Sequence, residues 1–224
     1  MTGRQFAALL RKDLRLEIRT RETLTSVLLF SILVMFVFQF GFANDRLTRF
    51  APGIMWATIS LAAILVIGRA WVAERDQKVL DLLLIAPVPR GLLAAAKAVT
   101  IFLQLLLMEV MVVPMVGVLF VDGPFAADLG LVAAICLLAD IAIALLGTLV
   151  AGLAVFTRAR ELLVPAMALP LMIPVVIGAS GATRAVLGVA NDMPEYVRYA
   201  ELLAGYAVVL GLVAYATFEA LFDD

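Results

Sequence analysis

The 224-residue sequence contains no histidine and only one cysteine, Cys136. Without histidine the chain lacks the commonest metal ligand and the commonest general base, which excludes a Ser-His or Cys-His catalytic pair and a His-ligated metal. A single cysteine excludes a disulfide within the chain. Charged residues are also scarce, at 16%, and the net charge of −1 indicates no nucleic-acid partner.

Apolar residues dominate what is present. They make up 64% of the chain, and the mean hydropathy is +1.09, whereas soluble domains average roughly 45–50% apolar residues. Six runs are long enough to cross the ~30 Å of membrane hydrocarbon, and none alternates with the period of a barrel strand. We therefore predict an all-α integral membrane protein with one domain over residues 1–224. The predicted spans are 24–43, 52–71, 93–119, 130–156, 162–181 and 203–222.

Lysine and arginine are unevenly distributed between the connections. Thirteen of the 17 lie before the first span or near the connections after the second and fourth spans, and four lie in the other connections. Cytoplasmic loops of membrane proteins carry an excess of these residues. We therefore predict that both termini are cytoplasmic.

Residues 4–20 have the pattern of an amphipathic helix. Basic residues occupy most of its surface, and the apolar face contains Phe6, Leu9, Leu10, Leu14 and Ile18. Such a helix lies in the plane of the lipid headgroups, so we predict an interfacial elbow helix that turns into the first span. A basic flank that only sets the topology is the alternative, and the two interpretations are compatible.

Residues 74–90, ERDQKVLDLLLIAPVPR, place charge between the second and third spans. Glu74 and Lys78 are four residues apart, in the favourable order for a helical pair. The residue before Pro87 is pushed out of the α region, so we predict a short helix over 74–86 at the cytoplasmic surface. Its apolar stripe, which faces either the bundle or a groove of a partner, contains Val79, Leu80, Leu83 and Leu84. An ordinary interfacial connector is the alternative.

The chain contains no G-x-x-x-x-G-K-[ST] motif, so it does not bind ATP through a P-loop. It also contains no nucleophile elbow, kinase loop or metal-binding cluster of the usual spacing. Any energy source is therefore a partner protein or an ion gradient. We predict that the chain is not an enzyme but the membrane component of an energised complex.

Four stretches resemble type 2 ABC exporter permeases, and in particular the haem exporter permease family of the cytochrome c maturation system. The first is W-x-x-E-x-x-x-x-x-L-[DE]-x-L-L-x-x-P-V-x-R at 71–90, followed by Lys97. The others are APGIMWATISLAAIL at 51–65, RKDLRLEIRTRETL at 11–24 and LVPAMALPLMIPVVIGAS at 163–180. With the chain length and the six spans, the resemblance covers most of the sequence.

The resemblance implies a type 2 exporter bundle in the bacterial inner membrane, paired with a separate cytoplasmic ATPase, usually as two copies of each chain. The helix at 74–86 is then the coupling helix, which sits in a groove of the ATPase. Transferred residue by residue, this contact is formed by Glu74, Asp76, Leu80, Asp81, Leu83, Leu84 and Pro87. The family usually has glycine where Lys78 stands and glutamate where Asp81 stands. Lys78 is the larger change, because a glycine there would let the helix kink.

The resemblance also implies further partners. They are a haem-handling membrane protein, a small membrane protein and a haem-loaded periplasmic chaperone, which is released at the expense of ATP. ATP then acts through the ATPase, and haem is handled by the partners, because only methionine and Cys136 remain here as weak haem ligands. Two alternatives stay open: the permease of another type 2 exporter, for a drug, lipid or polysaccharide, and a membrane scaffold that transports nothing.

Glu109 and Asp140 lie near the middle of the third and fourth spans. A charge at that depth costs at least ~2.5–3.5 kcal/mol on insertion scales, and we expect no lysine or arginine of this chain at the same depth. The cost falls if the carboxyl groups are protonated, share a proton, or meet a polar cavity or a partner. We predict that both face the bundle interior or a second copy of the chain. Neutral acids that merely hydrogen-bond a neighbouring helix are the alternative.

Two further features concern the second half of the chain. Pro165, Pro170 and Pro174 fall in one span, where each frees a backbone carbonyl, so we predict either a kinked gate or fixed curvature. The connection at 182–201 is partly apolar. We predict that it forms a short interfacial segment on the outer face, which either docks a partner or anchors the sixth span through its tyrosines.

Overall fold

In the computed structural model, the described residues are 2–42, 47–71, 89–123, 125–154, 157, 159–187 and 192–220. Every regular element in these ranges is a helix, which confirms the all-α class. The elements are α1 (Thr2–Thr20), α2 (Glu22–Gly41), η1 (Leu47–Arg49), α3 (Ala51–Arg69), α6 (Arg90–Phe120), α7 (Phe125–Ala154), α8 (Arg160–Leu187) and α9 (Met193–Ala220). The six predicted spans are confirmed, because α2, α3, α6, α7, α8 and α9 are each long and apolar enough to cross a membrane.

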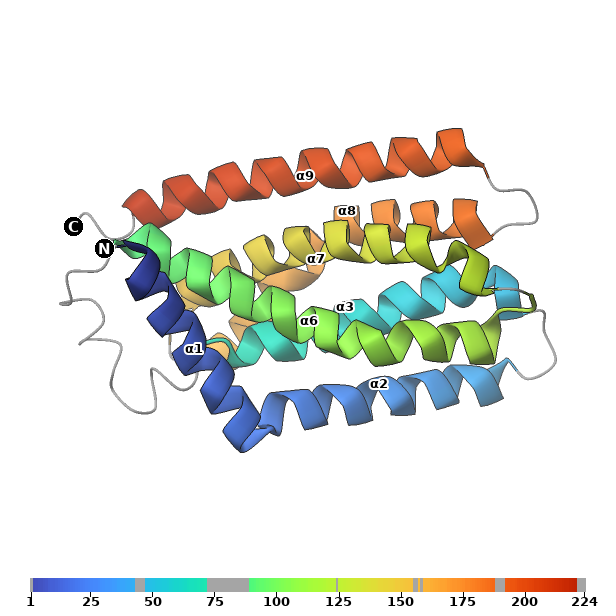
Figure 1. The fold of residues 1–224 in the computed structure, drawn as a ribbon, viewed down its shortest axis with the longest axis horizontal. Helices are drawn as coiled ribbons and strands as arrows, with labels where there is room; N and C mark the ends of the chain where they lie inside the picture. Colours follow the sequence, from blue (N-terminus) through green and yellow to red (C-terminus); the bar gives the residue numbers. More distant parts are fainter. Residues whose placement is uncertain are drawn as a thin grey trace.

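The six long helices run up and down alongside one another, and α1 crosses one end of the bundle obliquely (Figure 1). We call this the elbow end. The helices α1, α2, α6 and α8 begin there, and α3, α7 and α9 end there (Figure 1). The helix predicted over residues 4–20 is confirmed, with bounds at Thr2 and Thr20.

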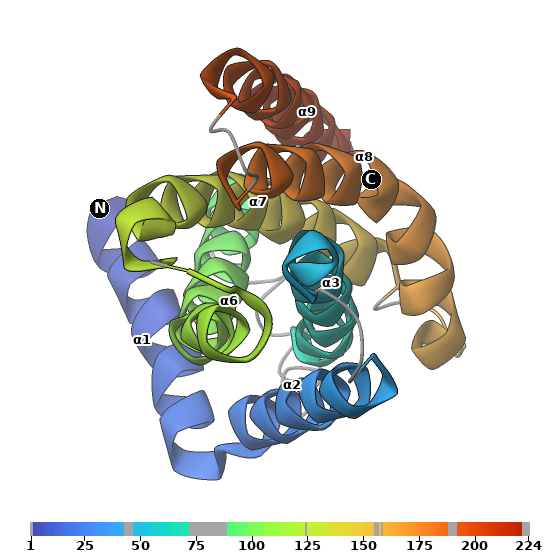
Figure 2. The same cartoon turned by 90° about the vertical axis from the view of Figure 1, so that its right-hand side faces the viewer.

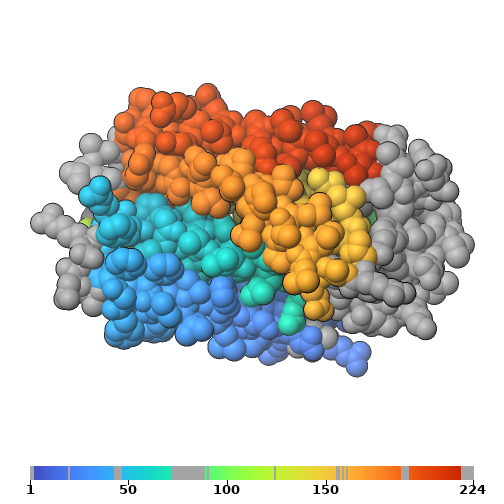
Figure 3. Space-filling model, turned by 180° about the vertical axis from the view of Figure 1, so that it is seen from behind, coloured from blue at the N-terminus to red at the C-terminus, as the bar shows by residue number. Residues whose placement is uncertain are grey.

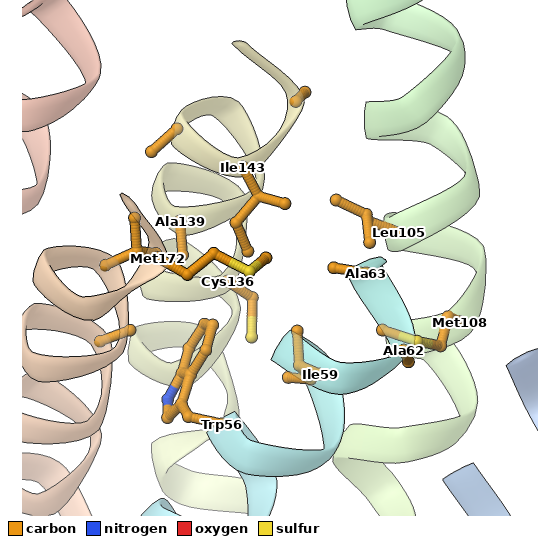
Figure 4. Packing of buried hydrophobic residues seen from close by; sticks show 14 of the residues in the cluster. Trp56, Ile59, Ala62, Ala63, Leu105, Met108, Cys136, Ala139, Ile143 and Met172 are labelled. Atoms are coloured by element: carbon orange, nitrogen blue, oxygen red, sulfur yellow. The ribbon is translucent and has the colours of Figure 1, made fainter. Parts of the chain in front are cut away.

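The core lies around α3, which contacts α2, α6, α7 and α8 and is enclosed by them in the end-on view of Figure 2. Trp56 and Ile59 of α3 are fully buried, and they point toward Cys136 of α7 (Figure 4). The indole Nε1–H of Trp56 donates a 2.9 Å hydrogen bond to Thr183 Oγ1 of α8. This bond satisfies the polar edge of a side chain that is otherwise in an apolar environment.

The outer helices show the opposite pattern, with large apolar side chains on the outside. On α2 the exposed residues include Leu29, Leu33, Phe36, Val37 and Phe40, and on α9 they include Val208, Val209, Leu212, Val213 and Tyr215. Side chains of α9, α8, α3 and α2 follow one another across the face seen in Figure 3. An apolar exterior around a packed core is what lipid as a solvent requires.

The prediction of a connection over all of 182–201 was wrong, whereas its docking or anchoring role stays a prediction. The helix α8 continues to Leu187, and α9 already begins at Met193. Asp192 Oδ1 accepts a 3.0 Å hydrogen bond from the backbone N–H of Glu195, which caps the new helix. Pro194 is tolerated because an N–H in the first turn of a helix has no intrahelical partner. Tyr196 of this stretch packs against α7, where its Oη donates a 3.1 Å hydrogen bond to the Leu131 carbonyl.

Small residues bring the helices close together. A Cβ atom added to Gly147 of α7 would lie 2.6 Å from the Ile67 side chain of α3, and one added to Gly181 of α8 would lie 2.6 Å from the Tyr199 ring of α9. The three prolines of α8 lie within one continuous helix, and the helix follows a curved path in Figure 2. Proline is a common cause of such bending.

Candidate functional site

The seven residues predicted to contact an ATPase lie outside the described residues, and so does Lys78. They are Glu74, Asp76, Leu80, Asp81, Leu83, Leu84 and Pro87, within 72–88. Their role stays a prediction. The residues on either side are placed: Trp71 follows the last turn of α3, and Pro89 directly precedes α6. Both of these helix ends lie at the elbow end (Figure 1), where α1 packs against α6.

A buried ion pair joins α1 to α6 at this end. Lys97 Nζ of α6 lies 2.9 Å from Asp13 Oδ2 of α1, and the two side chains are only 5% and 7% exposed. Lys12 Nζ lies 3.1 Å from the other carboxylate oxygen, Oδ1, and the Thr100 hydroxyl lies 3.5 Å from Oδ2. A buried charge without such partners is strongly unfavourable, so these contacts favour the packing of α1 on α6.

The second acidic residue of α1, Glu17, connects α1 to α6 and to α2. Its Oε2 accepts a 3.1 Å hydrogen bond from Gln104 Nε2 of α6, and its Oε1 accepts a 2.9 Å bond from the Leu24 backbone N–H. The latter bond satisfies a free N–H in the first turn of α2. Between the helices, Arg21 has a φ of 55°, which only glycine adopts without strain. The elbow is therefore a sharp turn supported by side-chain bonds on one side.

The same lysine links both flanks of the undescribed segment. Lys97 Nζ lies 5.1 Å from the centre of the Trp71 ring, which is within cation–π range. The two residues belong to the chain before and after 72–88. The end of α3, the first turns of α6 and the elbow helix thus meet at one lysine side chain.

Reasoning from sequence missed this junction. It placed the helix over 4–20 in the plane of the headgroups but assigned no role to Asp13 and Glu17. A pattern was available: Asp13 and Glu17 are four residues apart, and Lys97, Thr100 and Gln104 follow one another at spacings of three and four. Each set therefore occupies one helix face. Their pairing across 84 to 87 positions of sequence follows only from the packing of α1 on α6.

A second buried polar group lies between α6 and α7. Glu109 is 5% exposed and Asp140 is fully buried. Glu109 Oε1 and both carboxyl oxygens of Asp140 receive no hydrogen bond from a described donor. The two carboxyl groups and the buried thiol of Cys136 nonetheless interact with one another. Both acids thus lie in the bundle interior, and their functional role stays a prediction.

Neither group resembles a catalytic centre. Among the described residues, no cluster of three or more Cys, Asp or Glu side chains could hold a metal ion. What the elbow-end junction offers is a mechanical connection: one ion pair, one amide–carboxylate bond and one cation–π contact join three helices.

The chain is similar to known proteins of one family. Residues 4–222 match the family model described as CcmB protein. The chain is 34% identical over 218 residues to heme exporter protein B of Rhodobacter capsulatus, covering 96% of this chain and 97% of that protein. It is 33% identical over 216 residues to heme exporter protein B of Paracoccus denitrificans, covering 95% of each chain.

A third relative, heme exporter protein B of Bradyrhizobium diazoefficiens, is 32% identical over 183 residues, covering 81% of this chain and 82% of that protein. The matches include the elbow helix, the flanks of the undescribed segment and all six long helices. The family resemblance noted in the four sequence stretches is therefore confirmed. The chain belongs to the CcmB family.

Proposed function

We propose that the chain is the transmembrane permease of an ABC transporter complex that serves the biogenesis of c-type cytochromes. The match of residues 4–222 to the CcmB family, with relatives named heme exporter protein B, carries this proposal. In it, a separate cytoplasmic ATPase binds and hydrolyses ATP, and the coupling helix at 74–86 receives its movement. The elbow end faces the cytoplasm, in agreement with the 13 basic residues assigned to that side.

The proposed complex contains two copies of this chain, two ATPase chains, a haem-handling membrane protein and a small membrane protein. The complex either delivers haem to the periplasm or releases a haem-loaded chaperone there. Haem contacts belong to the partner proteins, because this chain has no histidine to ligate the iron strongly. The junction at Lys97 supports the coupling role, since it joins both flanks of the proposed coupling helix to α1.

Deletion of the gene tests the cellular role. We expect the deletion strain to lose c-type cytochromes, detected by haem staining, and to accumulate the haem-bound chaperone in the membrane fraction. Re-expression of the intact chain should restore both. Normal cytochrome levels in the deletion strain would overturn the assignment to cytochrome biogenesis and favour another type 2 exporter.

A double variant tests the coupling helix. Asp81→Arg with Leu84→Glu should abolish co-purification of the ATPase while the chain still reaches the membrane. A matched control is Glu161→Arg with Leu162→Glu, which makes the same types of change at exposed positions of α8 at the elbow end. We expect this control to retain the ATPase. An unchanged complex with the first double variant would contradict the proposed contact.

A further inference from the structure

Glu109 and Asp140 are buried acids that the proposed coupling role does not use. Glu109 lies in the middle turns of α6 and Asp140 in those of α7. With 5% and 0% exposure, respectively, neither reaches the surface of the bundle. Three of their four oxygens receive no hydrogen bond from a described donor. Buried polar atoms without a partner are rare in native structures and call for an explanation.

Neighbouring cations do not provide that explanation. Among the described residues, the two carboxyls interact with each other and with the Cys136 thiol, one turn before Asp140 on α7. Lys97 precedes Glu109 by 12 residues on α6, or ~18 Å along the helix at 1.5 Å per residue. Described charged residues on the neighbouring helices lie within the first or last nine residues of each helix and include Glu22 of α2, Arg69 of α3, Glu161 and Arg184 of α8, and Glu195, Arg198 and Glu201 of α9.

A contact between two carboxyl groups lacks a donor until one of them carries a proton. Two ionised carboxylates in contact repel each other strongly away from water, and two acids that share a site do not both ionise. One proton changes both effects: it removes the repulsion and supplies the missing O–H donor. The resulting bond between an acid and a carboxylate is one of the short, strong kind.

We propose that Glu109 and Asp140 form an intramembrane proton-binding site, in which the two carboxyl groups share one proton and carry one negative charge between them. The proton moves between an Asp140 oxygen and a Glu109 oxygen, and the O–H bond that breaks on one re-forms on the other. The Cys136 S–H donates to the charged partner. Because Asp140 is fully buried and Glu109 nearly so, proton exchange with water requires the helices around the pair to open, which links proton release to a change in helix packing.

Infrared spectroscopy of the full-length chain in lipid nanodiscs tests the site. At a pH where exposed carboxyls are ionised, we expect the C=O band of one protonated carboxyl per chain, shifted by D₂O only slowly. Asp140→Asn and Glu109→Gln should each remove the band, because each leaves a single carboxylate beside an amide N–H donor. Asp128→Asn, at a partly exposed position on the same helix, is the matched control and should leave the band unchanged.

No band in the wild-type chain would overturn the proposal, and so would a band that survives either single substitution. If the substituted chains do not fold, carboxyl ¹³C labelling of the wild-type chain replaces them. Labelled aspartate and labelled glutamate should each shift the same band, and a band that responds to only one label would exclude sharing. None of these outcomes depends on the ATPase or on haem, so the site stands or falls independently of the proposed function.

Discussion

At the α1–α6 contact the buried acid faces a cation, whereas at the α6–α7 contact the buried acid faces another acid. Asp13 has Lys97 at 2.9 Å and Lys12 at 3.1 Å. Among the described residues, Glu109 and Asp140 interact with each other and with a thiol. The first contact keeps its charges and loses stability if one is removed. The second tolerates neutral side chains, since there is no counter-charge to leave unpaired.

Removal of the lysine should break the first contact with the largest effect. Lys97→Met leaves the Asp13 carboxylate buried, with Lys12 as a remaining ion-pair partner. Loss of one member of a buried pair costs about 3–5 kcal/mol, and we expect the lower end because Lys12 remains. The free energy of unfolding in mixed detergent micelles measures the loss. Adding Asp13→Asn to this variant should recover part of it.

The matched control breaks an exposed pair instead. Arg184 Nη2 lies 2.7 Å from Glu195 Oε1, and the arginine side chain is 63% exposed. Exposed pairs contribute about 0–1 kcal/mol, so Arg184→Met should cost less than about 1 kcal/mol by the same assay. Equal losses for the lysine and arginine variants would show that burial does not distinguish the two contacts.

Glu17 is expected to have the next largest effect. Glu17→Ala removes the acceptor for Gln104 and for the Leu24 N–H. Loss of a helix cap and a charge-assisted bond costs about 1–2 kcal/mol. Increased amide hydrogen exchange in the first turn of α2 should accompany this loss of stability. Unchanged exchange at Leu24 would show that the capping bond does not hold the elbow.

The elbow residue itself should have a smaller and opposite effect. Arg21→Gly removes the strain of a left-handed backbone conformation at φ 55° but gives the unfolded chain more freedom, so we expect a gain of at most about 1 kcal/mol. Arg21→Ala removes the same charge and keeps the strain. The difference in stability between these two variants isolates the effect of the left-handed backbone conformation. A glycine variant less stable than the alanine variant would show that this conformation is not strained.

The acid pair should respond least. Glu109→Gln with Asp140→Asn removes whatever charge the pair carries and leaves amides that can bond each other, so we expect a stability change within about 1 kcal/mol. The same micelle assay measures this change. A small change here and a large loss for Lys97→Met would show that only the α1–α6 contact depends on its charges. Retention of assembly together with cytochrome maturation would mean that the pair is not needed for function.

Much of the fold could be predicted, because lipid imposes long apolar helices that composition alone reveals. The predicted starts of α2 and α3 differ from those observed by at most two residues. The start of α9 was missed by ten residues. The reason is local: Asp192 caps a helix through a charged and tyrosine-rich stretch, and a hydropathy pattern treats such a stretch as a connection.

Of the two buried polar sites, one could be predicted from the sequence and the other could not. Glu109 and Asp140 could be singled out from sequence, since an acid in the middle of an apolar run is conspicuous. Asp13, Glu17 and Lys97 could not, because acids and bases are ordinary in an interfacial helix and near the end of a span. Their burial depends on how α1 packs on α6.

The sequence by itself determined that this chain spans a membrane six times, that it carries no P-loop, and that two acids lie at the depth of the hydrocarbon. These properties follow from the composition of the chain and the order of its residues, because lipid requires long apolar helices. The tertiary structure alone decided which acids meet cations and which meet each other. Those pairings join residues dozens of positions apart, and only the packing of helices brings them within the few ångströms at which charges and hydrogen bonds act.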